Sequence, residues 1–478
     1  MSRIRYVCLS DLHFGASNSL LTHLTTDCTQ VDPTQPSPVL KALIACSEAL
    51  LAADGNSAKP ILILNGDAIE LALATDEVAG MAFQRFIELI VLQNSESLFD
   101  PGIIFIPGNH DHHLWETARE TQYVNFINRT PGDLLQAPWH TTSMFSVEYP
   151  VPSTLLEALI RCCRPQSKVR VRVVYPNYGL LSKDGRKCVV FSHGHFTESI
   201  YTLMSVLRCM VSPGHTMPST SWDCETENFA WIDFFWSTMG RSGDVGKNVE
   251  QIYDKIRDPL AKQELVDTLS ASIVERWGRP YWPRWLQAAV VKLVLNELGA
   301  KAALRERSRA DGPLSEDGRK GLTWYLTTPL IGQICEECEK TGRTKPVEYT
   351  FVYGHTHKPF QERLPLQEFV SPLDIYNSGG WVVDAVDPEP PKGGAIVLID
   401  DDLNVVSIRM YNEDIEGKSP QVSVETTDQP AAKKNPFLDY IRALIDPSKS
   451  PWVDFTEAVR GSRKAYVANL KLKIRSDE

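Results

Sequence analysis

Five short stretches of the sequence place acidic, amide and imidazole side chains directly after a run of apolar residues. Six of the eleven histidines of the chain fall within these stretches. Carboxylate, amide and imidazole groups bind divalent metals and transfer protons. One such stretch alone carries little weight, but five in one chain indicate a shared site. The stretches are YVCLSDLH, ILILNGD, IIFIPGNHD, VVFSHGH and FVYGHTH, and their chemically active residues are Asp11, His13, Asp67, Asn109, His110, Asp111, His193, His195, His355 and His357.

The segments that precede these residues are typical of buried β-strands. Each has four to six mostly apolar or β-branched residues, as expected for strands covered on both faces. In layered α/β folds, ligand sites form beyond the carboxyl ends of the strands. Glycine stands in four of the five stretches and lets the backbone turn sharply and approach an ion closely. We therefore predict an α/β fold whose strand ends gather these side chains at one edge.

Taken in order, the motifs D-x-H, G-D, G-N-H-D, H-G-H and G-H-x-H resemble the signature of the calcineurin-like metallophosphoesterases. The resemblance covers residues 1–198 and 346–413. It implies a four-layer αββα sandwich, in which two packed sheets are flanked by helices, with a helical insertion. It also implies a site for two divalent metal ions that hydrolyses phosphate esters or anhydrides, with a metal-bridging hydroxide as the nucleophile.

The resemblance assigns a role to each metal-binding motif. The expected ligands of the first metal are Asp11, His13 and His357. Those of the second metal are Asn109, His193 and His355, and Asp67 is expected to bridge the two ions. Mn²⁺, Fe and Zn²⁺ all suit these nitrogen and oxygen ligands, so the ligand set does not determine the metal. Two carboxylates against two divalent ions leave the site positive, which suits an anionic phosphate.

The resemblance also identifies the candidate acid. His110 matches the residue that contacts the phosphate and protonates the leaving group. Asp111, which follows it, is expected to orient His110 or a neighbouring loop. One position departs from the family: Glu70 stands three residues after the aspartate of the Gly-Asp motif, where Asp or Asn is frequent, and we expect it to lie outside the metal ligands. The signature does not require His112 and His113, and a substrate role and a surface or capping role both stay open for them.

The net charge of −11 disfavours nucleic acid as the main partner, because phosphate backbones need a basic surface. No arginine follows the Gly-Asp motif closely, which argues against the serine/threonine phosphatase branch. The expected substrate is therefore a phosphorylated small molecule or an amphiphile. A nuclease of the same fold and a catalytically inactive binding scaffold are the alternatives.

Neither a secretory signal nor a membrane span is expected. The N-terminal segment has no long apolar region with a cleavage site. The longest apolar helix candidate, residues 285–299, contains Lys292 and is shorter than the ~20 residues that a span needs. Ten scattered cysteines suit reduced thiols, so we expect a cytoplasmic protein, and the pair Cys335 and Cys338 cannot alone complete a four-ligand zinc site. Peripheral membrane contact and the oligomeric state stay open.

Residues 199–345 are predicted to form a helical insertion between two motifs. Seven of the eleven tryptophans lie there, and an apolar stripe at helical spacing is formed by Ile252, Ile256, Val266, Leu269, Ile273 and Trp277. Because the insertion begins and ends beside metal-binding motifs, we expect a lid that selects an amphiphilic or bulky substrate. Packing within the insertion or a dimer contact is the alternative role for its aromatic residues. Residues 414–435 are polar and contain proline, which predicts a linker, and residues 436–478 are expected to form a helical tail.

Overall fold

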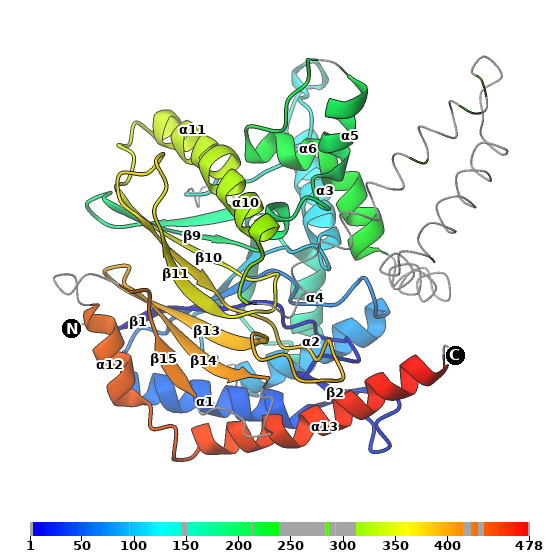
Figure 1. Cartoon of the computed structure of the whole chain (residues 1–478), viewed down its shortest axis with the longest axis vertical. Coiled ribbons are helices and arrows are strands. Elements are labelled where there is room, and N and C mark those ends of the chain that lie inside the picture. The colour runs from blue at the N-terminus through cyan, green and yellow to red at the C-terminus, as the bar shows by residue number, and fades with distance from the viewer. Residues whose placement is uncertain are drawn as a thin grey trace.

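The computed structural model describes residues 3–94, 96–145, 151–212, 214–238, 312–413, 422–428 and 435–476, together with residues 283, 285 and 292. Within these residues the chain is a mixed α/β structure, with two large sheets and helices packed on them (Figure 1). The apolar stripe predicted over residues 252–277 lies outside the described part of the chain.

The larger sheet has the strand order β15-β14-β13-β1-β4-β5-β7-β6. Its parallel strands are β1 (Ile4–Leu9), β4 (Ile61–Asn65), β5 (Gly102–Ile106) and β7 (Arg170–Val173). Antiparallel strands complete it: β13 (Gly393–Asp400), β14 (Val405–Asn412), β15 (Ser423–Glu425) and β6 (Val151–Pro152). In register, Cys8 pairs with Ile63, and Ile63 pairs with Ile104. The motifs that follow β1, β4 and β5 therefore begin at the same edge of the sheet.

The second sheet has the order β11-β12-β10-β9-β8. Its strands are β8 (Asn177–Leu181), β9 (Lys187–Ser192), β10 (Glu348–Tyr353), β11 (Phe360–Leu364) and β12 (Leu373–Asn377). The neighbours β9 and β10 are parallel, with Phe191 opposite Val352, so their motifs also begin side by side. A separate hairpin joins β2 (Thr22–Leu24) to β3 (Val31–Pro36).

Alternate strand residues face two different apolar cores. One core lies between the sheets and includes Ile63, Ile104, Val189 and Val352. The residues next to them in sequence, such as Leu62, Phe105, Val190 and Phe351, belong to a larger core that also contains helical residues. Because successive side chains of a strand point to opposite faces, a strand covered on both faces must be apolar throughout. This accounts for the apolar runs that precede each motif.

The helices that accompany the larger sheet are α1 (Pro38–Asp54), α2 (Asp76–Ile90), α3 (His113–Ile127), α4 (Thr154–Cys163), α12 (Pro436–Leu444) and α13 (Trp452–Ser476). The Ser37 hydroxyl caps α1 by accepting from the Leu40 amide at 3.0 Å, and the helix ends at Gly55 in a left-handed conformation. The helix α13, 25 residues long, packs along α1 (Figure 1). The predicted C-terminal tail thus contains two helices within the described residues.

The regular structure in the described parts of the predicted insertion is helical. They comprise α5 (Leu203–Val211), α6 (Ser221–Ile232), the π-helical turn η3 (Asp233–Ser237), α10 (Glu316–Tyr325), the π-helical turn η6 (Leu326–Leu330) and α11 (Ile331–Thr341). Tyr325 of α10 is fully buried, and its ring lies 6.3 Å from that of Phe351 on β10. The end of this region is therefore part of the layer that covers the second sheet (Figure 1).

The predicted linker contains a strand. Residues Ser423–Glu425 form β15 at the edge of the larger sheet, where Arg409 of β14 forms an ion pair with Glu425 at 2.8 Å. A three-residue strand in a polar segment forms only because it pairs with a neighbouring strand. The composition of the segment does not predict that pairing. None of the described helices is long and apolar enough to cross a membrane.

Candidate metal centre

The ends of five strands bring the predicted ligands together between the two sheets. Asp11 and His13 follow β1, Asp67 follows β4, and Asn109 follows β5. From the second sheet, His193 follows β9, while His355 and His357 follow β10. The side-chain amide of Asn65 at the end of β4 donates to the Ser192 carbonyl at 2.9 Å, which joins the two sheets at this edge.

A first group of ligand atoms comes from Asp11, His13 and His357, which lie within 4.8 Å of one another. The Nε2 atoms of His13 and His357 are 3.2 Å apart, and His357 Nε2 lies 3.4 Å from Asp11 Oδ1. All three side chains are buried. Two imidazole nitrogens and a carboxylate that converge without solvent are a set that can hold a divalent ion.

A second group is centred on His193. Its Nε2 lies 3.3 Å from Asp67 Oδ2, 3.0 Å from Asn109 Oδ1 and 3.2 Å from His355 Nδ1. Asp11, Asp67 and His193 also lie within 4.8 Å of one another. The structure thus brings all seven predicted metal ligands into two adjoining groups.

The backbone at these ligands adopts an unusual conformation. Among the described non-glycine residues, seven have a positive φ, and five of them are candidate ligands: Asp11, His13, Asp67, His355 and His357. Their φ angles lie between 47° and 67°, in the left-handed region. Such a conformation costs on the order of 1–3 kcal/mol per residue and gathers at functional sites. Five of the seven strained residues thus lie in the turns that carry candidate ligands, and the other two, Cys28 and Leu403, lie elsewhere.

Two motif glycines are required by close packing against the ligands. A Cβ atom added at Gly108 would overlap Asp67 Oδ1, and one added at Gly354 would overlap Asp11 Oδ2. Neither overlap involves a flexible side-chain end, because both carboxylates are buried. These glycines therefore leave the space that the carboxylates occupy.

The buried carboxylates and imidazoles of the site shift one another's pKa. Burial alone would raise the pKa of Asp67, but the His193 imidazole holds it well below its ordinary value. Conversely, burial would lower the pKa of His193, but Asp67 raises it to about 9. A proton on His193 thus balances Asp67 when no metal is bound. The same negative potential attracts a divalent ion.

Glu70 organises two histidines of the site. Its Oε1 lies 2.8 Å from His110 Nδ1, and its Oε2 lies 2.8 Å from His13 Nδ1. Burial would raise the pKa of Glu70, but His110 and His13 hold it well below the ordinary value, so it is a carboxylate. His110 Nε2 is buried and has no hydrogen-bond partner among the described residues. The reactive nitrogen of the candidate acid is therefore free to meet a ligand.

Asp111 does not have the orienting role at His110 that we considered. Its carboxylate accepts from the backbone amides of Gly108 at 2.6 Å and Ala68 at 2.7 Å, and more weakly from those of Asp67 and Ile69 at 3.3 Å. Among the described contacts none joins it to the His110 ring, which Glu70 holds instead. Asp111 thus fixes the two loops that carry Asp67 and Asn109, the second role expected for it.

Two further acidic residues orient candidate ligands. The sequence analysis did not predict either of them. Glu198 Oε1 lies 2.9 Å from His355 Nε2, and Asp384 Oδ2 lies 3.0 Å from His357 Nδ1. Carboxylates that bind the outer nitrogen of a histidine ligand fix its orientation. Glu198 follows the H-G-H motif by three residues, which was the available signal, whereas Asp384 stands in no motif.

His112 and His113 lie against the predicted insertion instead of facing solvent. His112 is fully buried with its Nε2 2.9 Å from Glu225 Oε1, and His113 Nδ1 lies 3.0 Å from Asp233 Oδ1. His195, the last residue of H-G-H, lies beside the ligand groups, with its Nε2 3.2 Å from the Tyr175 hydroxyl. Cys335 and Cys338, which stand three residues apart in the sequence, both lie on α11 and are free thiols.

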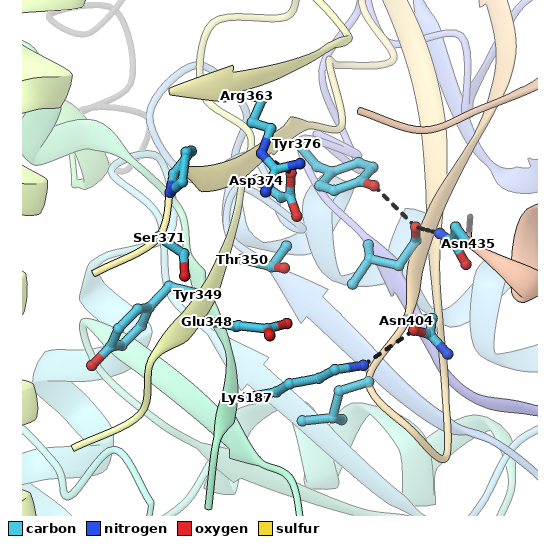
Figure 2. Close-up of a pocket in the computed structure, with 13 residues that line it drawn as sticks. Lys187, Glu348, Tyr349, Thr350, Arg363, Ser371, Asp374, Tyr376, Asn404 and Asn435 are labelled. Atoms are coloured by element: carbon cyan, nitrogen blue, oxygen red, sulfur yellow. Dashed lines mark hydrogen bonds and ion pairs between the residues drawn. The ribbon is translucent and has the colours of Figure 1, made fainter. Parts of the chain in front are cut away.

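Figure 2 shows a polar pocket whose lining includes none of the candidate ligands. It has a volume of about 280 Å³ and lies at the amino end of β10, where Glu348 and Thr350 line it. Its charged residues are Lys187, Glu348, Arg363 and Asp374. Two basic and two acidic groups balance one another, and Lys187 donates to Asn404 at 3.3 Å (Figure 2).

No protein-family model matches this sequence, and no curated protein matches it either. What the centre does is therefore inferred from its geometry and its chemistry.

Proposed function

We propose that the chain is a dinuclear-metal hydrolase of phosphate esters or anhydrides, with the four-layer αββα architecture of the calcineurin-like metallophosphoesterases. The observation that carries the proposal is the position of Asp67. Its Oδ2 lies 3.3 Å from His193 Nε2 in one ligand group and 3.8 Å from His13 Nε2 in the other. One carboxylate placed between two groups of candidate ligands is suited to bridge a pair of metals.

One ion would be held by Asp11, His13, His357 and Asp67, and the other by Asp67, Asn109, His193 and His355. Two divalent ions bound there would supply Lewis acidity and lower the pKa of water. The protein contributes fixed positions: Glu198 and Asp384 hold the outer nitrogens of His355 and His357. Phosphoryl transfer depends mainly on such positioning and on charge stabilisation.

His110 is the residue suited to protonate the leaving group. Glu70 holds its Nδ1, and its Nε2 is buried without a hydrogen-bond partner among the described residues. The His110 backbone amide donates to Asp67 Oδ1 at 2.8 Å, so the acid and the bridging carboxylate keep a fixed relation. A proton delivered from Nε2 to the leaving oxygen would complete the cleavage of the ester or anhydride bond.

A pocket beside the centre supports a substrate with an apolar part. Its volume is about 330 Å³, and Phe196, Val206, Met217 and Trp324 line it. Glu198, which contacts His355, lines it too. Three of its four apolar residues come from the predicted insertion, so this region is suited to select an amphiphilic or bulky phosphate ester.

Metal content and turnover of the purified protein test the proposal. The wild type should carry about two transition-metal ions at this centre and hydrolyse p-nitrophenyl phosphate or its bis ester with Mn²⁺ but not after chelation. Asp67→Asn should lower both metal content and turnover, because both ions share this charge. Turnover that survives metal removal, or equal metal content in the two proteins, would refute the proposal. Preference for the diester would favour a phosphodiesterase or nuclease over a monoesterase.

A further inference from the structure

A further buried group of side chains that could hold a metal lies next to the loop that carries His110. It consists of His112, Glu116 and Glu225, whose ligand atoms lie within 4.8 Å of one another. The exposed fractions of these residues are 0%, 8% and 0%, so the group is buried. None of the three belongs to the groups around Asp67, and the function proposed above does not use them.

Two different parts of the fold build this group. His112 immediately precedes α3, and Glu116 follows four residues later, so both side chains lie on one face of the first helical turn. Glu225 comes from α6 in the predicted insertion. The Tyr175 hydroxyl donates to Glu225 Oε2 at 2.8 Å and fixes that carboxylate from the side of the sheet. A bound ion here would join the insertion to the core.

The polar atoms of the group are incompletely paired. Glu116 Oε2 is 2.5 Å from Arg119, but Glu116 Oε1 is buried and has no hydrogen-bond partner among the described residues. His112 Nδ1 likewise lacks a hydrogen-bond partner there, and its nearest acidic oxygen, on Asp233, is 3.7 Å away. A buried carboxylate oxygen without a partner is costly unless a cation satisfies it. Arg119 pairs with one oxygen of Glu116, and the other oxygen is open to a ligand.

The charge of the group depends on the protonation of His112. Burial would lower the pKa of His112, but Glu225 and Asp233 raise it to about 10. A proton on His112 therefore balances Glu225, while Arg119 balances Glu116. A divalent ion could replace that proton and bind the neutral imidazole together with both carboxylates.

We propose that His112, Glu116 and Glu225 bind a third divalent cation, which ties α6 of the insertion to α3 of the core. One imidazole and two carboxylates suit Zn²⁺ or Mn²⁺. The ion is structural, because its site is buried and shares no residue with the two groups that contain Asp67. The alternative to a bound ion is a proton on His112.

The metal content of the full chain distinguishes a bound ion from a proton on His112. The protein is stripped with a chelator, reloaded with Zn²⁺ or Mn²⁺, dialysed and measured by elemental analysis. The wild type should hold about three ions per chain and Glu225→Gln about two. Glu227→Gln is the matched control, because Glu227 lies on the same helix but pairs with Arg208 outside the group, and it should hold as many ions as the wild type. Equal counts in Glu225→Gln and the wild type would overturn the third site.

A second pair of variants separates this site from the proposed dinuclear centre. Asp67→Asn should lose ions while keeping the one that depends on Glu225, so adding Glu225→Gln to it should remove about one more. If the dinuclear centre does not exist, the wild type should hold one ion that Glu225→Gln removes and Asp67→Asn does not. Glu116→Gln provides the same readout should Glu225→Gln fail to fold. An ion count in Glu116→Gln equal to that of the wild type would likewise count against the site.

Discussion

Glu70 joins the candidate acid to the candidate metal centre, because its Oε1 lies 2.8 Å from His110 Nδ1 while its other oxygen lies 2.8 Å from His13 Nδ1. A single buried carboxylate thus accepts from both imidazoles and fixes which nitrogen of each ring faces the site. Glu70 therefore orients both the candidate acid, His110, and a candidate metal ligand, His13.

Glu70→Gln should therefore lower turnover by about 10–100-fold, because the amide cannot accept from both imidazoles. The loss should be larger for esters with poor leaving groups. In a double-mutant cycle, Glu70→Gln should have little further effect once His110 is replaced, if it acts through that residue. Glu88→Gln on α2, whose carboxylate pairs with Arg85 at the surface, is the control. Additive losses in the cycle would show that Glu70 acts elsewhere.

His110→Gln should keep its metal but lose turnover by about 10²–10⁴-fold, the usual range for a general acid. Esters with good leaving groups need less protonation and should lose less. Steady-state rates for a series of substituted phenyl phosphates measure this dependence, and elemental analysis checks the metal. A loss of the same size across the whole series would favour phosphate positioning over proton transfer.

Much of the centre was predictable because strand and ligand signals coincide in the sequence. An apolar run marks a strand, and the polar residue after it, such as Asp67 or His193, lies at the strand end. Glu225 could not be predicted, since its contact with His112 depends on how α6 packs over the core. The same holds for α10 and α11: helical spacing shows that they bury one face, but not that the face lies on β10.

The roles of acidic neighbours were predictable only in part. Asp111 follows the acid in sequence, yet its carboxylate accepts from the backbone amides of Gly108 and Ala68. Glu70 lies 40 residues from His110 in the chain and holds its ring. Sequence adjacency indicates which loop a residue belongs to, whereas the direction of its side chain is decided by backbone angles that only the structure gives.

Metal affinity should rise with pH up to about 9. In the metal-free protein Asp67 raises the pKa of His193 to about 9, so below that pH an ion must displace a proton. Displacement of one proton changes the apparent affinity by about tenfold per pH unit, and the change should level off above the pKa. Competition with a chromogenic chelator at several pH values measures the affinity. Affinity that does not vary between pH 6 and pH 8, at roughly constant ionic strength, would contradict this account of His193.

Gly108→Ala should displace Asp67 and reduce metal content without unfolding the chain. The new methyl group would overlap Asp67 Oδ1, which cannot move away because the carboxylate is buried between the two ligand groups. Gly132→Ala is the control, since an added Cβ there meets no atom within 4 Å. Elemental analysis and thermal unfolding measure the two effects. Metal content equal to that of Gly132→Ala would mean that the loop tolerates the methyl group and that Asp67 is less constrained than its contacts indicate.

Trp324→Ala should change the preference of the proposed hydrolase for large substrates. Trp324 lines the apolar pocket that also contains Glu198, the residue that orients His355. Burial of each methylene group stabilises a complex by about 0.8 kcal/mol, so removal of one aromatic wall should weaken the binding of an alkyl chain by roughly tenfold. The ratio of kcat/KM for p-dodecylphenyl phosphate to that for phenyl phosphate measures this effect while leaving the reacting bond unchanged.

Trp222→Ala is the matched control, because Trp222 lies in the same region of the chain but does not line the pocket and is 39% exposed. A ratio that falls in Trp324→Ala alone would assign the pocket to the substrate. The same ratio in both variants and the wild type would mean that the aromatic residues of this region serve only its own packing.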